Sequence, residues 1–114
     1  MAAADSERTG LTFARTDDPD GHVRIAVSGE IDLTTVGDLR RTVDATIGET
    51  GVARVDLDLA GLTFLDSRGT MALIETRRLA RSCRVTFRIV NATGTVLRVL
   101  TALGVHRMLA GQPR

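Results

Sequence analysis

The chain has 114 residues, of which 43% are hydrophobic and 3% aromatic, and its formal net charge is +1. A chain of this length forms a single domain with one core, and no apolar stretch reaches the ~20 residues that a membrane-spanning helix needs. All 15 basic residues are arginine, which excludes a Walker-type phosphate loop, a Schiff base and a phosphoacceptor receiver site, since each needs a lysine.

The N-terminal segment MAAADSERTG has neither the basic start nor the apolar core of a signal peptide, so we expect a cytoplasmic protein. Residues 1–9 are small and polar and predict a flexible tail, followed by one domain over 10–110 and a C-terminal tail over 111–114. Cys83 has no second cysteine for a disulfide and no neighbouring Cys or His for a metal site. We therefore predict that it packs in the core, and we expect no metal site in the chain.

The first ordered segment is predicted to be a β-hairpin. LTFAR begins a strand that stops at the turn TDDPDG, where Pro19 fixes its φ and Gly21 tolerates the angles of a chain reversal. HVRIAVSG returns as the second strand, and its apolar residues Val23, Ile25 and Val27 alternate onto one face.

A helix is predicted next, with Thr34 or Thr35 as its N-cap and Gly48 at its end. Apolar residues recur at helical spacing over this stretch, which gives an inward stripe of Val36, Leu39, Val43 and Ile47.

VARVDLDLAGLTFL returns to alternation with period two and is predicted to be the third strand. One face carries the apolar residues Ala53, Val55, Leu57 and Leu59. The other face carries Arg54, Asp56 and Asp58, so this side of the sheet is expected to be partly wet. The two aspartates faintly resemble the pair on a phosphatase strand, but the lysine of such sites is absent, and simple solvation is the preferred interpretation.

A second helix is predicted directly after Asp66. Its inward stripe consists of the small and apolar residues Gly69, Ala72, Leu73, Thr76, Ala80 and Cys83. Arg77, Arg78 and Arg81 are expected to point outward. Glu75 is predicted to pair with Arg78, three residues further along the helix.

The remaining segments complete an α/β pattern. RVTFRIV predicts a strand with Val85, Phe87 and Ile89 inward. ATGTVLRVLTALG predicts a third helix that ends at Gly104 and buries Val96, Val99, Leu100 and Leu103, and VHRML predicts a short final strand. The order β-β-α-β-α-β-α predicts one mixed sheet with right-handed crossovers and helices packed against it.

Charge is distributed unevenly along the chain. Residues 1–66 have a net charge of −7, whereas residues 67–114 have a net charge of +8 and one acid, Glu75. A basic half is compatible with nucleic-acid binding, but base-stacking aromatic residues are missing and the arginines are spread over several elements. A solvated face or an acidic protein partner is the preferred interpretation.

Ser67 lies in FLDSRGT, where the third strand meets the second helix, the place where open α/β sheets usually carry function. A helix start tolerates an anion, so a phosphate on Ser67 would cost the fold little and would add about two negative charges to the surface. Ser67 as a simple N-cap stays open as an alternative. A catalytic serine fits poorly, because Leu65 stands where the nucleophile elbow wants glycine and only His22 and His106 could serve as the base.

Three segments carry a resemblance to a known family: VSGEIDLTT, VDLDLAGLTFLDSRGTMALIE and FRIVNATGTVLRVLTALGVHRML. They span residues 11–109, and the combination of G-E-[IL]-D with a later aspartate-serine-x-glycine helix start resembles the STAS domain family. More narrowly, the pattern is similar to bacterial anti-sigma factor antagonists.

The resemblance implies a STAS-like domain that acts as a non-enzymatic switch. In that family the unphosphorylated protein binds an anti-sigma factor, which is a serine kinase, and so frees a sigma factor; the kinase ends the binding by phosphorylating the serine that matches Ser67. ATP then belongs to the kinase, so no cofactor is expected on this chain. A phosphatase is an expected second partner, whereas direct nucleic-acid or membrane contact is not expected, and the chain is expected to be a monomer or a weak dimer.

Two residues depart from the family pattern. Arg68 stands where relatives commonly have another small hydroxyl residue, and Thr70 replaces a usual aliphatic residue. An arginine beside the phosphoacceptor could pair with the phosphate or with an acid of the kinase, so partner choice could differ. STAS modules also serve in transporters, lipid-transport complexes and stress-signalling assemblies, which is the alternative within the family.

We expect the partner surface to include the start of the second helix and the segment after Gly29. The surroundings of the phosphosite are Asp32, Asp66, Arg68 and Gly69, and the predicted partner contacts are Glu30, Asp32, Arg68, Thr70, Met71, Ile74, Arg77 and Arg78. Asp32 is predicted either to orient the Ser67 hydroxyl or to cap the first helix. Arg68, Met71 and Ile74 are expected to be exposed, with Met71 as the apolar anchor.

Two interpretations from other functional classes remain. A small serine hydrolase would use Ser67 as its nucleophile and would react with a fluorophosphonate probe. A nucleic-acid binder would be retained on DNA in a salt-sensitive way.

Overall fold

The computed structural model describes residues 10–111. The predicted tail at 1–9 and most of the one at 111–114 lie outside the described residues. The elements are β1 (Leu11–Asp17), β2 (His22–Ile31), α2 (Val36–Ile47), β3 (Arg54–Leu65), α3 (Ser67–Ser82), β4 (Thr86–Val90), α4 (Gly94–Ala102) and α5 (His106–Leu109). This confirms the α/β fold class and the order β-β-α-β-α-β-α, to which a short final helix is added.

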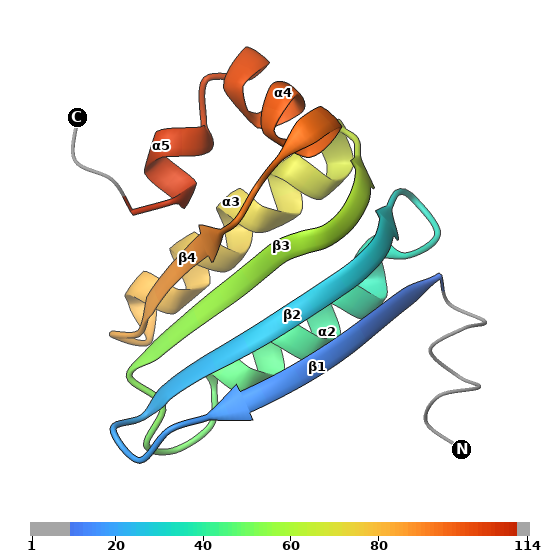
Figure 1. Cartoon of the computed structure of the whole chain (residues 1–114). Coiled ribbons are helices and arrows are strands. Elements are labelled where there is room, and N and C mark those ends of the chain that lie inside the picture. The colour runs from blue at the N-terminus through green and yellow to red at the C-terminus, as the bar shows by residue number, and fades with distance from the viewer. Residues whose placement is uncertain (1–9, 112–114) are drawn as a thin grey trace.

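The sheet has the strand order β1-β2-β3-β4. The hairpin partners β1 and β2 are antiparallel, whereas β2, β3 and β4 run parallel. Parallel neighbours need a crossover connection, and α2 and α3 supply the two that this sheet requires. Both helices cover the same face of the sheet, behind the strands in Figure 1, and this leaves the other face of β1 and β2 open.

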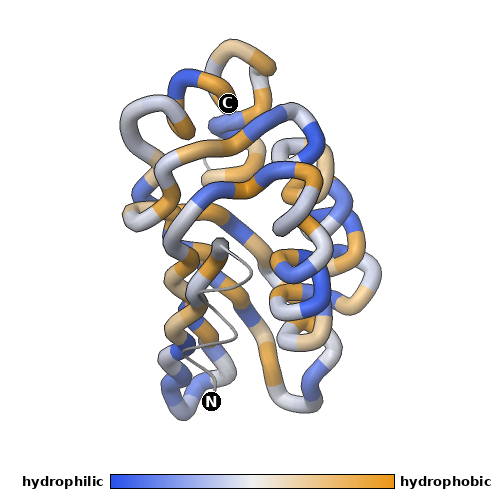
Figure 2. Tube along the Cα trace, turned by 90° about the vertical axis from the view of Figure 1, so that its right-hand side faces the viewer, coloured by the Kyte–Doolittle hydropathy of each residue, from blue (hydrophilic) through white to orange (hydrophobic). Residues whose placement is uncertain are grey.

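The core fills the space between the sheet and the pair α2 and α3. The predicted inward residues of the strands are buried there, among them Val23, Ile25, Val27, Val55, Leu57, Leu59, Phe87 and Ile89. Figure 2 shows apolar and polar segments alternating along the trace. The core cluster also includes Val96, Leu100 and Leu109 of α4 and α5. Burying one large apolar side chain stabilises a fold by about 1.5–3 kcal/mol, so these residues contribute strongly to stability.

Several predicted details of the core are wrong. Cys83 is exposed, because α3 ends at Ser82 and Cys83 occupies its C-cap. Leu103 is 51% exposed as the C-cap of α4, and Val99 is only half-buried. Ala53 precedes β3 and is exposed.

In the final segment VHRML, His106–Leu109 form the helix α5 and Val105 is its N-cap, so the prediction of a strand is wrong. The backbone N–H of Val105 donates to the Leu100 carbonyl oxygen at 3.0 Å, and that of Ala110 donates to the His106 carbonyl oxygen at 2.8 Å. These local bonds occupy groups that a sheet edge would need. The helices α4 and α5 pack beside β3 and β4 at the end of the sheet where α3 begins (Figure 1).

Candidate functional site

The site is built where β3 ends and α3 begins. Leu65, the last residue of β3, lies opposite Ile31, the last residue of β2, in the parallel register. Gly69 in the first turn of α3 packs directly onto both strand ends, because an added Cβ would lie 2.4 Å from Leu65 Cδ1 and 2.7 Å from Ile31 Cγ2. A glycine is therefore needed here for close approach, and it brings the start of α3 against the sheet.

Asp66 caps α3. Its carboxylate oxygen Oδ1 accepts a hydrogen bond from the Gly69 backbone N–H at 2.9 Å. Its carbonyl oxygen accepts from the Thr70 backbone N–H at 3.0 Å and from the Thr70 hydroxyl at 3.1 Å. The interpretation of Ser67 as the N-cap is therefore wrong, since the neighbouring aspartate already performs that function.

Ser67 is the first residue of α3, and its side chain is exposed. Its hydroxyl makes no hydrogen bond with any residue between 10 and 111. The first N–H groups of a helix have no intrahelical partner, and the positive end of the helix dipole favours an anion at this place. Ser67 thus presents a free hydroxyl at a position where added negative charge is compatible with the fold.

Asp32 lies in the turn that precedes α2 and makes local hydrogen bonds there. Its Oδ1 accepts hydrogen bonds from the Thr34 hydroxyl at 2.7 Å and from the Thr34 backbone N–H at 2.9 Å, which hold the pKa of the carboxyl below its usual value. Its carbonyl oxygen accepts from the backbone N–H groups of Thr35 and Val36. The Asp32 carboxylate thus holds the turn before α2, whose N-cap is Thr35, and it bonds no N–H group of the helix itself. No hydrogen bond joins Asp32 to Ser67 in the described part of the chain.

Thr35 occupies the N-cap position of α2, one of the two threonines predicted there, but its side chain makes no capping hydrogen bond. Its hydroxyl instead donates to the Glu30 carbonyl oxygen at 2.8 Å and accepts from the Asp32 backbone N–H at 3.0 Å. The segment after Gly29 is therefore tied into a tight turn that is held by local hydrogen bonds. Gly48 is the C-cap, as predicted.

The predicted partner contacts differ in accessibility. Glu30, Arg68, Met71 and Arg78 are exposed, with Met71 at 54%. Arg77 is half-buried. Thr70, a predicted partner contact, is buried, and its hydroxyl bonds within the first turn of α3. Ile74 was predicted to be exposed, but it is half-buried and packs against the core, so that prediction is wrong.

A groove lies between α2 and α3, beside the first turn of α3. Its volume is about 310 Å³ and its lining consists of Val36, Gly37, Arg40, Arg68, Met71, Ala72 and Glu75. Arg40 crosses between the two helices, with Nη1 2.7 Å from Glu75 Oε1 and Nε 2.9 Å from Asp44 Oδ2. The predicted pairing of Glu75 with Arg78 is therefore wrong, because Glu75 pairs with α2 instead. Sequence reasoning missed this groove, since it depends on how two helices meet.

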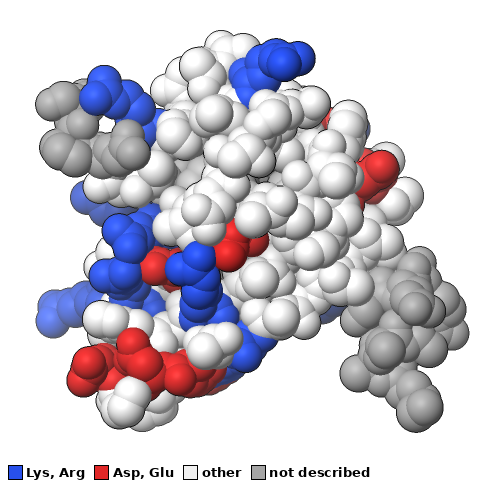
Figure 3. Space-filling model, in the orientation of Figure 1, with Lys and Arg blue, Asp and Glu red and all other residues white. Residues whose placement is uncertain are grey.

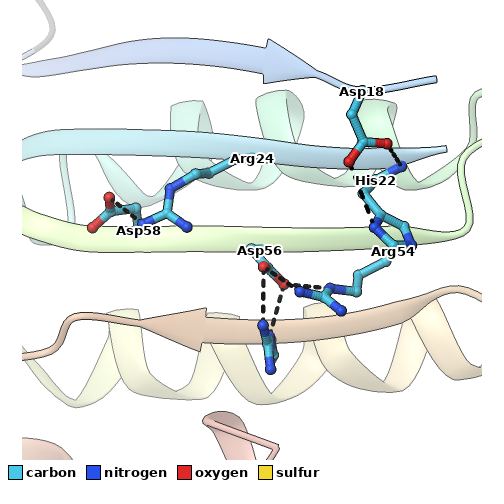
Figure 4. A network of polar contacts seen from close by, with 7 residues as sticks. Asp18, His22, Arg24, Arg54, Asp56 and Asp58 are labelled. Atoms are coloured by element: carbon cyan, nitrogen blue, oxygen red, sulfur yellow. Dashed lines mark hydrogen bonds and ion pairs between the residues drawn. The ribbon is translucent and has the colours of Figure 1, made fainter. Parts of the chain in front are cut away.

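The outer face of the sheet carries a second polar cluster (Figure 4). Asp56 is only 7% exposed and lies between the guanidinium groups of Arg54, with Nη2 3.0 Å from Oδ2, and Arg88, with Nε 2.9 Å from Oδ1. Burial raises the pKa of Asp56, but the hydrogen bonds from the two arginines outweigh it, so the pKa lies below its usual value. The prediction of simple solvation is wrong for Asp56.

Asp58 belongs to the same face. It accepts from the Ala60 backbone N–H at 2.9 Å, from Arg24 at 3.0 Å and from Asn91 at 3.1 Å. Burial raises its pKa, and these three donors lower it further than burial raises it. Both aspartates thus act as acceptors that join neighbouring strands, and neither presents a free carboxylate for catalysis.

Arginines before and after Ser67 differ in their pairing. Each described arginine before Ser67 forms an ion pair, namely Arg15, Arg24, Arg40, Arg41 and Arg54. After Ser67 only Arg88 does so, and no ion pair within residues 10–111 involves Arg68, Arg77, Arg78, Arg81, Arg84, Arg98 or Arg107. Figure 3 shows the paired charges interleaved on the outer face of the sheet. The unpaired cations lie on or beside α3, α4 and α5.

The described residues do not assemble the other kinds of site that were considered. No three His, Cys, Asp or Glu side chains gather as a metal site within residues 10–111. His22 lies at the start of β2, with Nδ1 3.6 Å from Asp18 Oδ2, at the end of the sheet opposite to Ser67. Among the described helices, none has the length and apolar character to cross a membrane.

Comparisons with known proteins agree with this architecture. An anti-sigma factor antagonist from Mycobacterium paratuberculosis has a similar structure, with a TM-score of 0.73, 24% identity, and 87% of this chain and 82% of that chain covered. The Bacillus cell fate determinant SpoIIAA in its phosphorylated form is also similar, with a TM-score of 0.64 and 21% identity. The match covers 82% of this chain and 85% of that chain. The murine solute carrier 26 family member A9 anion transporter has a TM-score of 0.72 and 16% identity, and the match covers 90% of this chain but 20% of that chain.

These identities are low, and the structural likenesses by themselves show the fold. No curated protein matches the chain. A family model described as the STAS domain matches residues 14–113, nearly the whole chain. The chain therefore belongs to the STAS domain family.

Proposed function

We propose that the protein is an anti-sigma factor antagonist of the bacterial cytoplasm. It binds an anti-sigma factor that is also a serine kinase, so that a sigma factor is released, and it loses this binding once the kinase has phosphorylated Ser67. The observation that carries the proposal is the exposed Ser67 hydroxyl, which makes no hydrogen bond in the described chain because Asp66 caps the helix in its place.

The physical consequences of phosphorylation differ between fold and interface. A phosphate at the start of α3 would meet unsatisfied N–H groups and the positive end of the helix dipole, so the fold would tolerate it. The same phosphate adds about two negative charges and new bulk to the surface beside Met71 and Arg68. A partner fitted to the neutral hydroxyl would then meet uncompensated charge, which lowers its affinity.

The similar structures support this proposal by their fold. One is an anti-sigma factor antagonist, and another is SpoIIAA in a phosphorylated form. In the proposed scheme the chain itself performs no chemistry: ATP is bound by the kinase, and a phosphatase restores the free hydroxyl. A serine hydrolase is disfavoured, because no histidine of the described chain is hydrogen-bonded to Ser67.

The test is phosphorylation in vitro. The purified chain is incubated with ATP and, one at a time, with the anti-sigma kinases of the source organism, and the product is mapped by peptide mass spectrometry. One kinase is expected to place a single phosphate on Ser67, and the Ser67→Ala variant is expected to remain unmodified. A phosphate on another residue, or none with every kinase, would contradict the proposal.

A further inference from the structure

The groove between α2 and α3 contains a glycine that neither packing nor backbone conformation explains. Gly37 is the second residue of α2, where glycine is a poor helix former. An added Cβ would have only the flexible guanidinium of Arg41 near it, with Nη1 at 3.4 Å and Nη2 at 4.0 Å. The missing side chain does leave one wall of the groove open, since Gly37 is part of its lining.

The two arginines of the groove are not equivalent. Arg40 is already neutralised by Asp44 and Glu75, at 2.9 and 2.7 Å. The Arg68 side chain is exposed and makes no ion pair or hydrogen bond with another residue of the described chain. The groove therefore offers one uncompensated cation next to the apolar side chains of Val36, Met71 and Ala72.

We propose that this groove binds a segment of the protein partner that places an apolar side chain against Val36, Met71 and Ala72 and a carboxylate on Arg68. The partner is the serine kinase of the proposed function, on which this site therefore depends. A nucleic acid is disfavoured, because a phosphate backbone needs several free cations in a row and the groove has one. An arginine gains most from a hydrogen-bonded carboxylate when apolar contacts beside it exclude water.

The position of Arg68 gives phosphorylation a direct way to release this segment. Arg68 follows Ser67 in the first turn of α3, so a phosphate on Ser67 would compete for the Arg68 guanidinium and would repel the bound carboxylate. Replacing Arg68 should thus weaken the complex of the unphosphorylated protein more than that of the phosphorylated protein. The difference in affinity between the two forms should shrink.

The experiment fills the groove or removes its cation, and measures the dissociation constant for the kinase by calorimetry. Gly37→Leu should lower the affinity about tenfold, while Ala45→Leu, which places the same side chain at an exposed position of α2 outside the groove, should stay within about twofold. Arg68→Ala should lower it about fivefold, and Arg98→Ala, which removes another unpaired arginine, should stay within about twofold. Thermal melting of each variant checks the fold, and Gly37→Leu should melt no lower than the wild type because leucine favours a helix over glycine.

A second measurement locates the contact directly. Methyl-labelled methionine reports Met71 in the groove and Met108 on α5, which is also exposed. Addition of the kinase should shift or broaden the Met71 methyl resonance and leave that of Met108 in place. A response of Met108 without one of Met71 would overturn the groove as the docking site.

The outcomes separate the two levels of the proposal. A wild-type chain that is bound and phosphorylated, with Gly37→Leu and Arg68→Ala bound equally well, would overturn the groove and leave the proposed function standing. A wild-type chain that no kinase binds or phosphorylates would overturn the proposed function, and the groove as a kinase site with it.

Discussion

On the outer face of the sheet the charged side chains are neutralised by one another, whereas along α3 they are left free. Asp56 is enclosed by two arginines that come from β3 and β4, and Asp58 joins Arg24 of β2 to Asn91. On α3 the arginines after Ser67 have no acidic partner in the described chain, because the one acid of that helix, Glu75, pairs with α2. Both regions are rich in arginine, so composition alone does not distinguish them.

The difference separates charge that maintains the fold from charge that is available to a partner. A carboxylate removed from water must keep its donors, and losing one partner of such a pair is costly. An exposed, unpaired arginine contributes little to stability, but its field accelerates association with an acidic protein. Variants of the sheet face should therefore change stability, and variants of α3 should change binding.

The largest effect is expected from negative charge on the free surface of α3. Ser67→Asp should lower the affinity for the kinase at least about a hundredfold, since an unpaired charge in an interface costs several kcal/mol. The free energy of unfolding should change by less than about 1 kcal/mol, because the helix start accepts an anion. Calorimetric titration and urea denaturation measure the two quantities.

Ser82→Asp provides the matched control, because Ser82 is exposed at the opposite end of the same helix. Its affinity for the kinase should remain close to that of the wild type. If Ser67→Asp unfolds, or if it binds the kinase as well as the wild type, the charge at this position does not act on binding alone, and the prediction is wrong.

The sheet face should show the reverse behaviour. Asp56→Asn leaves two arginines around a neutral side chain, so the free energy of unfolding should fall by about 2 kcal/mol in urea denaturation, while kinase affinity stays the same. Asp20→Asn, in the exposed turn between β1 and β2, should change it by less than about 0.5 kcal/mol. Equal stability of both variants would show that the pairs around Asp56 do not support the fold.

Acidification should lower stability through Asp56. The pKa of Asp56 in the folded protein lies below the usual 3.8, so the contribution of its carboxylate to stability is present above that value and is lost as the pH falls through the folded-state pKa. The free energy of unfolding should thus decrease below about pH 4. The decrease should be smaller in Asp56→Asn than in the wild type; identical pH profiles by urea denaturation would contradict this assignment.

The elements of the fold were predictable where sequence and local structure agree. Alternation in β2, β3 and β4 identified the buried strand residues, and the period of α2 and α3 identified most of their inward faces. The errors fall at ends: Cys83 and Leu103 occupy caps, where the helical period no longer decides which way a side chain points. The segment VHRML was misassigned because five residues fit a strand or one helical turn equally well, and packing against the neighbouring elements decides between them.

The site was predictable in part for a related reason. Ser67 follows from the junction of a strand and a helix, which is a local feature. The burial of Thr70 and Ile74 was not predicted, because it depends on the first-turn hydrogen bond and on the packing of α3 against its neighbours. Arg40 and Glu75 are 35 residues apart in the chain, and the groove lies between the same two helices. A local sequence pattern therefore predicts neither the pairing nor the groove.

A smaller effect is expected from reversing charge on α3. Arg77→Glu combined with Arg78→Glu should lower the association rate with the kinase about tenfold at low salt and less at high salt, because screening weakens electrostatic steering. Arg98→Glu combined with Arg107→Glu changes the net charge equally, but on α4 and α5. An equal loss of rate in both double variants would indicate a response to net charge alone rather than to the surface of α3.

The smallest effect tests the apolar part of the free surface. Met71 is 54% exposed in the first turns of α3, so Met71→Ala should leave the free energy of unfolding within about 0.5 kcal/mol. Its contact forms only in the complex, and removing a flexible apolar side chain from an interface acts mainly on dissociation. The dissociation rate should therefore rise about fivefold in surface plasmon resonance, with the association rate unchanged. Met108→Ala, which removes the same side chain from α5, should leave both rates unchanged. If Met108→Ala raises the dissociation rate and Met71→Ala does not, the partner binds across α5, and the free arginines of α3 are not its main contact.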